Sequence, residues 1–164
     1  ICGGRALELH LERSWREHAD TDVGIRRDDL ELVTALLESW DVWLAAKGEL
    51  THWDGRTLDS ARHENNLWVR DPASSKWALD LTINSGNDKE WSYRRNEELR
   101  RPWDEAILES DDVIPYLAPE LQLLFKSKNP RPKDHQDAEQ VIPRLSSERM
   151  EFLRRVLPEG HPWR

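Results

Sequence analysis

The sequence predicts an α+β fold, or a mixed α/β core with a helical tail, in which a small sheet comes first and helices follow. One sign is a stripe of apolar residues at spacings of three and four, which predicts an early helix: Leu30, Val33, Leu36 and Leu37. A second is residues 77–83, which alternate in polarity as a strand does. A third is the run of helix signals after Pro119. Strands followed by helices are typical of this fold class.

The first half of the chain supplies the expected sheet. Residues 6–13 are rich in helix formers and predict a short helix. The strands are expected at residues 23–25, 40–45, 67–69 and 77–83. The polar stretch 47–66 predicts irregular structure. In the last strand one face should carry Trp77, Leu79, Leu81 and Ile83, and the other Ala78, Asp80 and Thr82.

Beyond residue 83 the sequence predicts helices. Pro119 suits a first helical position, and the basic end of residues 119–128 matches the helix dipole. The prolines in residues 129–132 should break this helix. Asp134 should then cap a helix that runs to about residue 145, and Ser146 or Ser147 should cap the last one.

Length and charge limit the classes of function. A chain of 164 residues has room for a single core. With 24 basic against 32 acidic residues, its net charge of -8 argues against binding nucleic-acid polymers or anionic membranes, and it leaves room for a cationic substrate. The single cysteine, Cys2, excludes an internal disulfide and a cysteine-based zinc site, and no apolar run approaches a membrane span. We therefore expect a cytoplasmic protein.

Three features bear on chemistry. Gly3 and Gly4 are expected where a strand ends before a helix, a place where backbone amides can approach a phosphate, although such a pair is more often only a turn. Asp20 and Asp22 lie two apart beside a strand, so their carboxylates should face one side and favour a bound cation such as Mg²⁺; the alternative is a solvated turn. Asp80 is charged within an apolar strand, where it needs a cation or a solvated edge.

Together these residues resemble the nucleotidyltransferase superfamily with the DNA polymerase β-like fold, in which a Gly-Gly turn, a D-x-D motif and a later strand carboxylate recur. Residues 16–22 (REHADTD) resemble the R-x-H-x-D-x-D segment of the aminoglycoside 2''-adenylyltransferase-like group of antibiotic nucleotidyltransferases. Residues 116–121, 126, 131–134 and 137 resemble the C-terminal helices of that group. Arg5 departs from the pattern, because members often have Trp there. The segment that normally precedes the glycines is also expected to be missing.

The resemblance implies a small mixed sheet with flanking helices. Residues 1–115 would form the nucleotidyltransferase core, and residues 116–164 would form a C-terminal helical segment packed on it in the same domain. It also implies Mg²⁺ as cofactor and ATP as the nucleotide donor. Asp20 and Asp22 would ligate both metal ions. Asp80 would ligate the ion that activates the acceptor hydroxyl and would serve as general base.

The same resemblance implies that Gly3 and Gly4 hold the donor phosphates. Arg16, Lys126 and Lys133 are further phosphate-binding candidates, because guanidinium and ammonium groups neutralise phosphate oxygens. Each has an alternative: Arg16 as a surface residue paired with Glu12 or Glu17, and the lysines as matches to a helix dipole. Asp137, three residues after Asp134, is most simply part of a capping arrangement, while Arg94 and Arg95 stay open between nucleotide contact and exposure.

The expected function is transfer of a nucleoside monophosphate, AMP from ATP, to a hydroxyl of a small molecule, with antibiotic resistance as its consequence if the acceptor is an aminoglycoside. Two alternatives remain: a protein-modifying nucleotidyltransferase of a toxin–antitoxin kind, and a non-catalytic nucleotide-binding domain with the same fold. Trp68 and Trp77 flank a cleft where they either stack on a sugar or anchor the core. The oligomeric state is not indicated.

Overall fold

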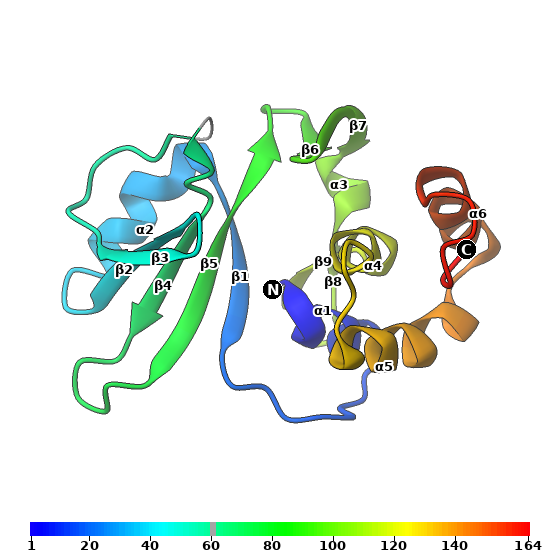
Figure 1. The fold of residues 1–164 in the computed structure, drawn as a ribbon, viewed down its shortest axis with the longest axis horizontal. Coiled ribbons are helices and arrows are strands. Elements are labelled where there is room, and N and C mark those ends of the chain that lie inside the picture. The colour runs from blue at the N-terminus through cyan, green and yellow to red at the C-terminus, as the bar shows by residue number, and fades with distance from the viewer. Residues whose placement is uncertain (60–61) are drawn as a thin grey trace. The chain divides into compact units, whose positions relative to one another are not determined.

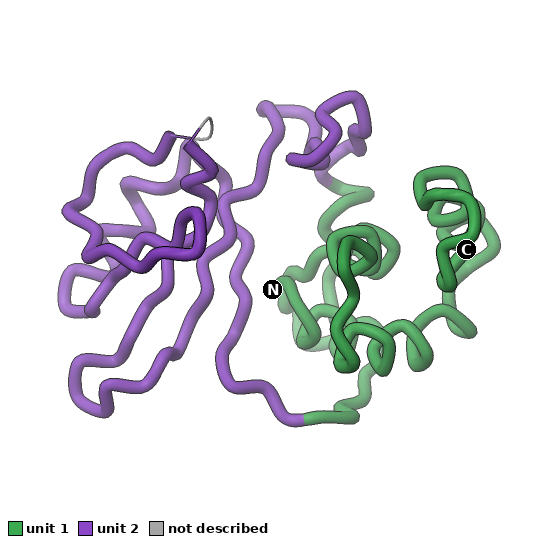
Figure 2. The backbone as a smooth tube through the Cα atoms, in the orientation of Figure 1, with its two compact units in different colours: residues 1–16, 104–164 green, residues 17–103 purple. Residues whose placement is uncertain are grey.

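The computed structural model of the protein describes residues 1–59 and 62–164, which form two compact units. Unit 1 comprises residues 1–16 and 104–164, and unit 2 comprises residues 17–103 (Figure 2). The chain thus begins in one unit, builds the whole of the other and returns. Residues 1–16 belong to the same unit as the C-terminal helices because the N-terminal helix packs against them, and the expected division at residue 115 stays a prediction.

Unit 2 is built on a mostly antiparallel sheet of seven strands (Figure 1). Its elements are β1 (Thr21–Arg26), the 3₁₀ turn η1 (Arg27–Asp29), α2 (Leu30–Leu36), β2 (Asp41–Ala46), β3 (Glu49–His52), β4 (Asn66–Arg70), β5 (Trp77–Gly86), β6 (Glu90–Tyr93) and β7 (Asn96–Pro102). The sheet order is β3-β2-β4-β5-β6-β7, and β1 pairs in parallel with β5. The four strands expected from the sequence are confirmed, and so is the α+β fold class.

The other three strands of unit 2 were not expected. β3 lies within the stretch 47–66, and all four of its residues are exposed. It therefore lacks the alternation of buried and exposed residues that would predict a strand. β7 is mostly exposed as well, and its run of charged residues resembles a loop in sequence. Residues 60–61 of the same stretch lie outside the described residues.

The core of unit 2 lies on one face of the sheet. Alternate residues of the strands turn toward it, and α2 and the following loops close it: Ile25, Leu30, Leu37, Val42, Leu44, Trp53, Leu58, Leu67, Val69, Leu81 and Ile83. Two expectations are wrong in detail. Leu36 is exposed, because it lies on the outer side of α2, while Leu37, the residue after the helix, is buried in the core. Trp77 contacts Trp68 on the opposite face, because the register shifts at Arg70.

Unit 1 is mainly helical. Its elements are α1 (Gly3–His10), α3 (Trp103–Ala106), β8 (Ile107–Glu109), β9 (Pro115–Leu117), α4 (Pro119–Lys126), α5 (Pro132–Val141), the 3₁₀ turn η3 (Ile142–Arg144) and α6 (Ser147–Val156). α1 packs against α4 and α5, and α4 packs against α6. Within the described ranges, no helix is both long and apolar enough to cross a membrane.

The helix signals of unit 1 are largely confirmed. Pro119 is the first residue of α4, and Ser146 caps α6 by accepting from the backbone N–H of Arg149 at 3.3 Å. Asp134 is the exception, because it lies inside α5 and reaches back to the N–H of Arg131 at 3.0 Å. The helix therefore begins at Pro132, where the missing N–H of proline costs no hydrogen bond.

Candidate active site

The structure brings two of the predicted carboxylates side by side in unit 2. β1 runs parallel to β5, and Asp22 is the register partner of Asp80. Adjacent strands lie about 4.8 Å apart, and partners in register point to the same face of a sheet. Because Val23 and Leu81 face the core, Asp22 and Asp80 face the opposite side. The acid within the apolar strand is thus next to the second acid of the D-x-D motif.

Asp20 lies just before β1 and is exposed, while Asp80 is largely buried. Burial raises the pKa of Asp80 to about 6, a hydrogen bond from Asn66 opposes this rise, and the negative charges of Asp22 and Asp20 add to it. The charges of Asp22 and Asp20 are therefore both felt at Asp80. Like charges held together in this way favour a cation between them.

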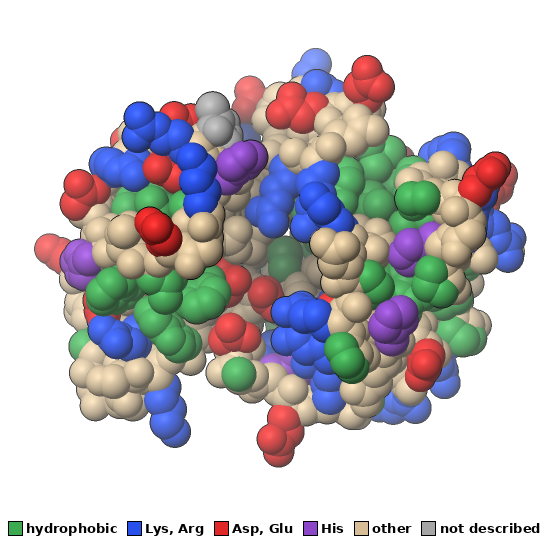
Figure 3. Space-filling model, in the orientation of Figure 1, with side chains coloured by type: hydrophobic (Ala, Val, Ile, Leu, Met, Phe, Trp, Pro, Cys, Tyr) green, Lys and Arg blue, Asp and Glu red, His purple; other side chains and the backbone are tan. Residues whose placement is uncertain are grey.

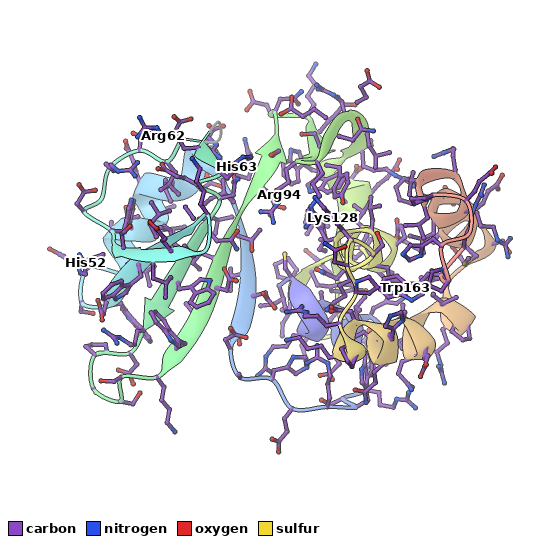
Figure 4. The ribbon with its side chains drawn as sticks, viewed as in Figure 1. His52, Arg62, His63, Arg94, Lys128 and Trp163 are labelled. Carbon is purple, nitrogen blue, oxygen red and sulfur yellow. The ribbon has the colours of Figure 1, made fainter. Side chains whose placement is uncertain are left out.

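Asn66 is a site residue that sequence reasoning missed. Its amide donates to Asp80 Oδ1 at 2.8 Å and to Thr82 Oγ1 at 3.1 Å. Its own Oδ1 accepts from Arg94 Nη1 at 3.5 Å, and Figure 4 labels Arg94 beside β5. Asn66 holds the Asp80 carboxylate in one orientation and connects it to the guanidinium of Arg94. One signal in the sequence could have found it: Asn66 is a polar residue of β4 on the same face of the sheet as Asp80.

The donor set fits Mg²⁺. Carboxylate oxygens suit this ion, which usually takes one or two carboxylates together with water and substrate phosphates. Asp22 and Asp80 supply that number as neighbours in register. Within residues 1–59 and 62–164, no group of three His, Cys, Asp or Glu side chains is close enough to form a complete protein cage for a metal. A site of this kind needs the nucleotide to complete it.

The glycine pair belongs to unit 1. Gly3 and Gly4 are the first two residues of α1, rather than a turn before it, and both are buried. The N–H of Gly3 donates to Gln122 Oε1 at 2.7 Å, and Gly3 has a φ of 68°, which favours glycine. A side-chain amide therefore occupies the Gly3 donor that the resemblance assigns to a phosphate.

Arg16 and Lys126 take part in an ion-pair network inside unit 1. Arg16 donates to both oxygens of Asp137, at 2.9 and 3.0 Å. Lys126 Nζ lies 2.8 Å from Asp134 Oδ1 and 3.0 Å from Asp137 Oδ2. Asp137 is thus the centre of an ion-pair network rather than part of a cap.

The cations of this network keep Asp134 and Asp137 ionised. Burial opposes ionisation of Asp137, but the hydrogen bonds from Arg16 and the charge of Lys126 outweigh it and lower its pKa. Asp134 behaves alike, because Arg131 and Lys126 lower its pKa against the effect of burial. Lys133, by contrast, is exposed at the second position of α5, and it is the one exposed side chain among the five residues assigned to donor phosphates.

A hollow of about 430 Å³ in unit 2 lies at the other end of β1 and β5. Its lining includes Arg26, Asn84 and Trp103, and it contains none of the three predicted carboxylates. Arg26 contacts Asp88 at 3.3 Å and lies over the ring of Trp103, so its charge is already engaged. The candidate site is therefore on the sheet face that carries Asp22 and Asp80.

Comparison with known proteins adds one likeness. No family model matches the chain, and no curated protein matches it. The crystal structure of the lincosamide antibiotic adenylyltransferase LnuA with bound lincomycin is similar, with a TM-score of 0.58 and 19% sequence identity over 85% of this chain and 82% of that chain. At this identity the likeness shows that the two chains share a fold.

Proposed function

We propose that the protein is a metal-dependent nucleotidyltransferase that moves AMP from ATP to a hydroxyl of a small molecule. The observation that carries the proposal is the register of β1 and β5, which sets Asp22 beside Asp80 on the sheet face opposite the core. The likeness to an antibiotic adenylyltransferase supports it. An antibiotic is accordingly the first acceptor class to test.

Asp22 and Asp80 would hold the metal together with the nucleotide, and the role of Asp20 as a further ligand stays a prediction, because no three such side chains of the described residues are grouped for one ion. Bound Mg²⁺ would supply positive charge for the phosphate oxygens, on which negative charge grows during transfer. Asp80 accepts the proton of the acceptor hydroxyl, whose oxygen forms a bond to the α-phosphorus while the bond to pyrophosphate breaks. Asn66 keeps the Asp80 carboxylate oriented through its 2.8 Å hydrogen bond.

The residues assigned to the donor phosphates, Gly3, Gly4, Arg16, Lys126 and Lys133, all belong to unit 1, and their role stays a prediction. Arg16 and Lys126 already neutralise Asp137, so their first effect is on the stability of unit 1. Lys133 is exposed and is the cation among them that a triphosphate would reach at the smallest cost in broken contacts.

The test is pyrophosphate release with Mg-ATP and two acceptors, lincomycin and kanamycin, which differ in charge. We expect release with one of them and its loss in Asp22→Asn and Asp80→Asn. Asp88→Asn is the matched control, because it removes an exposed carboxylate of the same unit, and it should leave turnover unchanged. The product should be the acceptor carrying one AMP, as measured by mass spectrometry.

Two outcomes would overturn the proposal in different ways. Calorimetric binding of Mg-ATP without turnover of any acceptor would favour the non-catalytic alternative. Transfer of labelled AMP to protein, but not to either antibiotic, would favour the protein-modifying alternative. Both experiments use the whole chain.

A further inference from the structure

A row of side chains crosses the sheet of unit 2 and ends at the proposed catalytic carboxylates. The strand registers pair His52 with Trp43, Trp43 with Trp68, Trp68 with Asp80, and Asp80 with Asp22. Partners in register share a face, so the five side chains lie in one line on the side opposite the core. Two indoles and an imidazole thus lead directly to the acids.

The aromatic members of the row contact one another or a neighbouring ring. The rings of Trp43 and His52 lie 5.6 Å apart and meet edge to face, and those of Trp68 and Trp77 do so at 5.5 Å. Figure 3 shows hydrophobic side chains gathered over β2, β4 and β5, and Figure 4 labels His52 at the outer edge of this region. We call Trp43, Trp68 and Trp77 the aromatic platform.

Arg70 fixes the platform in place. Its guanidinium lies over the rings of Trp43 and Trp77, at 5.5 and 5.3 Å from their centres. Asp41 accepts from Arg70 Nε at 2.8 Å and from the indole N–H of Trp43 at 2.8 Å. The platform therefore has little net charge of its own, and its indoles are held by contacts that need no ligand.

Such a surface favours one class of ligand. The face of an indole carries negative charge and attracts the slightly positive C–H groups of a saturated ring. A ring that rests on Trp68 has the Asp80 carboxylate on the adjacent strand, and adjacent strands lie about 4.8 Å apart. A hydroxyl on that ring would therefore be a neighbour of the Asp80 carboxylate.

We propose that the aromatic platform is the acceptor subsite and that the acceptor is a glycoside, which lays the apolar face of a sugar ring on Trp68 and directs one hydroxyl to Asp80. This deepens the proposed function and rests on it for the identity of the reacting hydroxyl. Recognition through ring faces selects amphipathic sugars over polycationic ones, because the Arg70–Asp41 pair leaves the platform near neutral.

The first experiment separates binding from chemistry. Trp68→Leu should raise the KM for the acceptor at least tenfold, with the KM for ATP changed less than twofold. Trp68→Phe, which keeps a ring but also lacks the indole N–H that contacts Asp80, should recover most of the loss in acceptor KM. Trp40→Leu is the matched control, because Trp40 is exposed and precedes β2, and its KM should equal that of the wild type. An unchanged acceptor KM in folded Trp68→Leu would overturn the platform.

A second experiment needs neither a variant nor turnover. Saturation-transfer NMR with wild-type protein and lincomycin, then kanamycin, without nucleotide, should show the strongest transfer to sugar-ring C–H protons, and more for lincomycin. Absence of ring transfer for both probes overturns the platform even if turnover is found. Ring transfer without any turnover leaves the platform in place and contradicts the proposed catalysis, so the two failures are distinguishable.

Discussion

Asp134 and Asp137 of unit 1 and Asp80 of unit 2 are all held away from solvent, but the charges around the first two are opposite in sign to those around Asp80. In unit 1, Asp134 and Asp137 are almost fully buried and contact the cations of Arg16, Lys126 and Arg131, and their pKa values are lowered. In unit 2, Asp80 is surrounded by an amide, an indole and two further acids, and burial raises its pKa to about 6.

This difference separates the acids that stabilise the fold from the acids proposed for catalysis. A buried carboxylate beside a guanidinium is stabilised as an ion, and removing the cation leaves a costly charge. A buried carboxylate beside other carboxylates destabilises the empty protein, and such an arrangement is typical of functional sites. The signs of the neighbours, rather than burial alone, identify Asp80 and Asp22 as the candidate site.

The largest expected effect follows from removing the charge of Asp80. Asp80→Asn keeps the shape of the side chain but cannot accept the hydroxyl proton, so we expect AMP transfer to fall by about 10³-fold. Because the variant also removes a buried charge from beside Asp22, its melting temperature should stay the same or rise. Pyrophosphate release and thermal unfolding measure the two effects. A large loss of stability would show that Asp80 has a structural role, as the buried acids of unit 1 do, and would contradict the difference drawn between them.

The second effect is on the stability of unit 1. Lys126→Met leaves Asp134 and Asp137 without one of their cations, and breaking such a buried pair costs about 3 kcal/mol of unfolding free energy. Urea denaturation measures the loss, and the exposed Lys128→Met should stay within about 0.5 kcal/mol of the wild type. Wild-type stability combined with a raised KM for ATP would instead make Lys126 a phosphate-binding residue.

The third prediction concerns Glu64, an acid of unit 2 that, unlike Asp80, is paired with a cation. Two hydrogen bonds from Arg56 to Glu64, at 2.7 and 2.8 Å, together with the N–H of Asp59, lower the pKa of Glu64 from 4.5 to about 2. Its contribution to stability is therefore full above the unfolded pKa of 4.5 and is lost as the pH falls through about 2.

Glu64→Gln tests this sign. The wild type should be the more stable protein at pH 6, and the difference between the two urea midpoints should shrink as the pH falls toward 2.5. Glu98→Gln, which changes an exposed glutamate of β7, is the control and should follow the wild type throughout. A constant difference across the pH range would mean that Glu64 acts through packing rather than through its charge.

The sequence drew attention to the carboxylates of the candidate site, whose role stays a prediction, better than to their surroundings. Asp22 and Asp80 could be singled out because a D-x-D spacing and a strand with period two are both local patterns. The partner of Arg16 was missed because Asp137 lies 121 residues away and comes near only when α1 packs on α5. Trp77 was assigned to the wrong face because the register shift at Arg70 depends on two strands at once.

The smallest expected effect concerns Lys133, whose exposed ammonium is the least constrained of the assigned phosphate contacts. Lys133→Ala should raise the KM for ATP about threefold, the size of one exposed ion pair, with stability unchanged. Lys128→Ala is the control, since it is also exposed but was assigned no phosphate role. Added salt should shrink the effect, because exposed charges are screened. Equal KM values for both variants would mean that Lys133 makes no specific contact with the triphosphate. The cations of unit 1 would then only stabilise the fold.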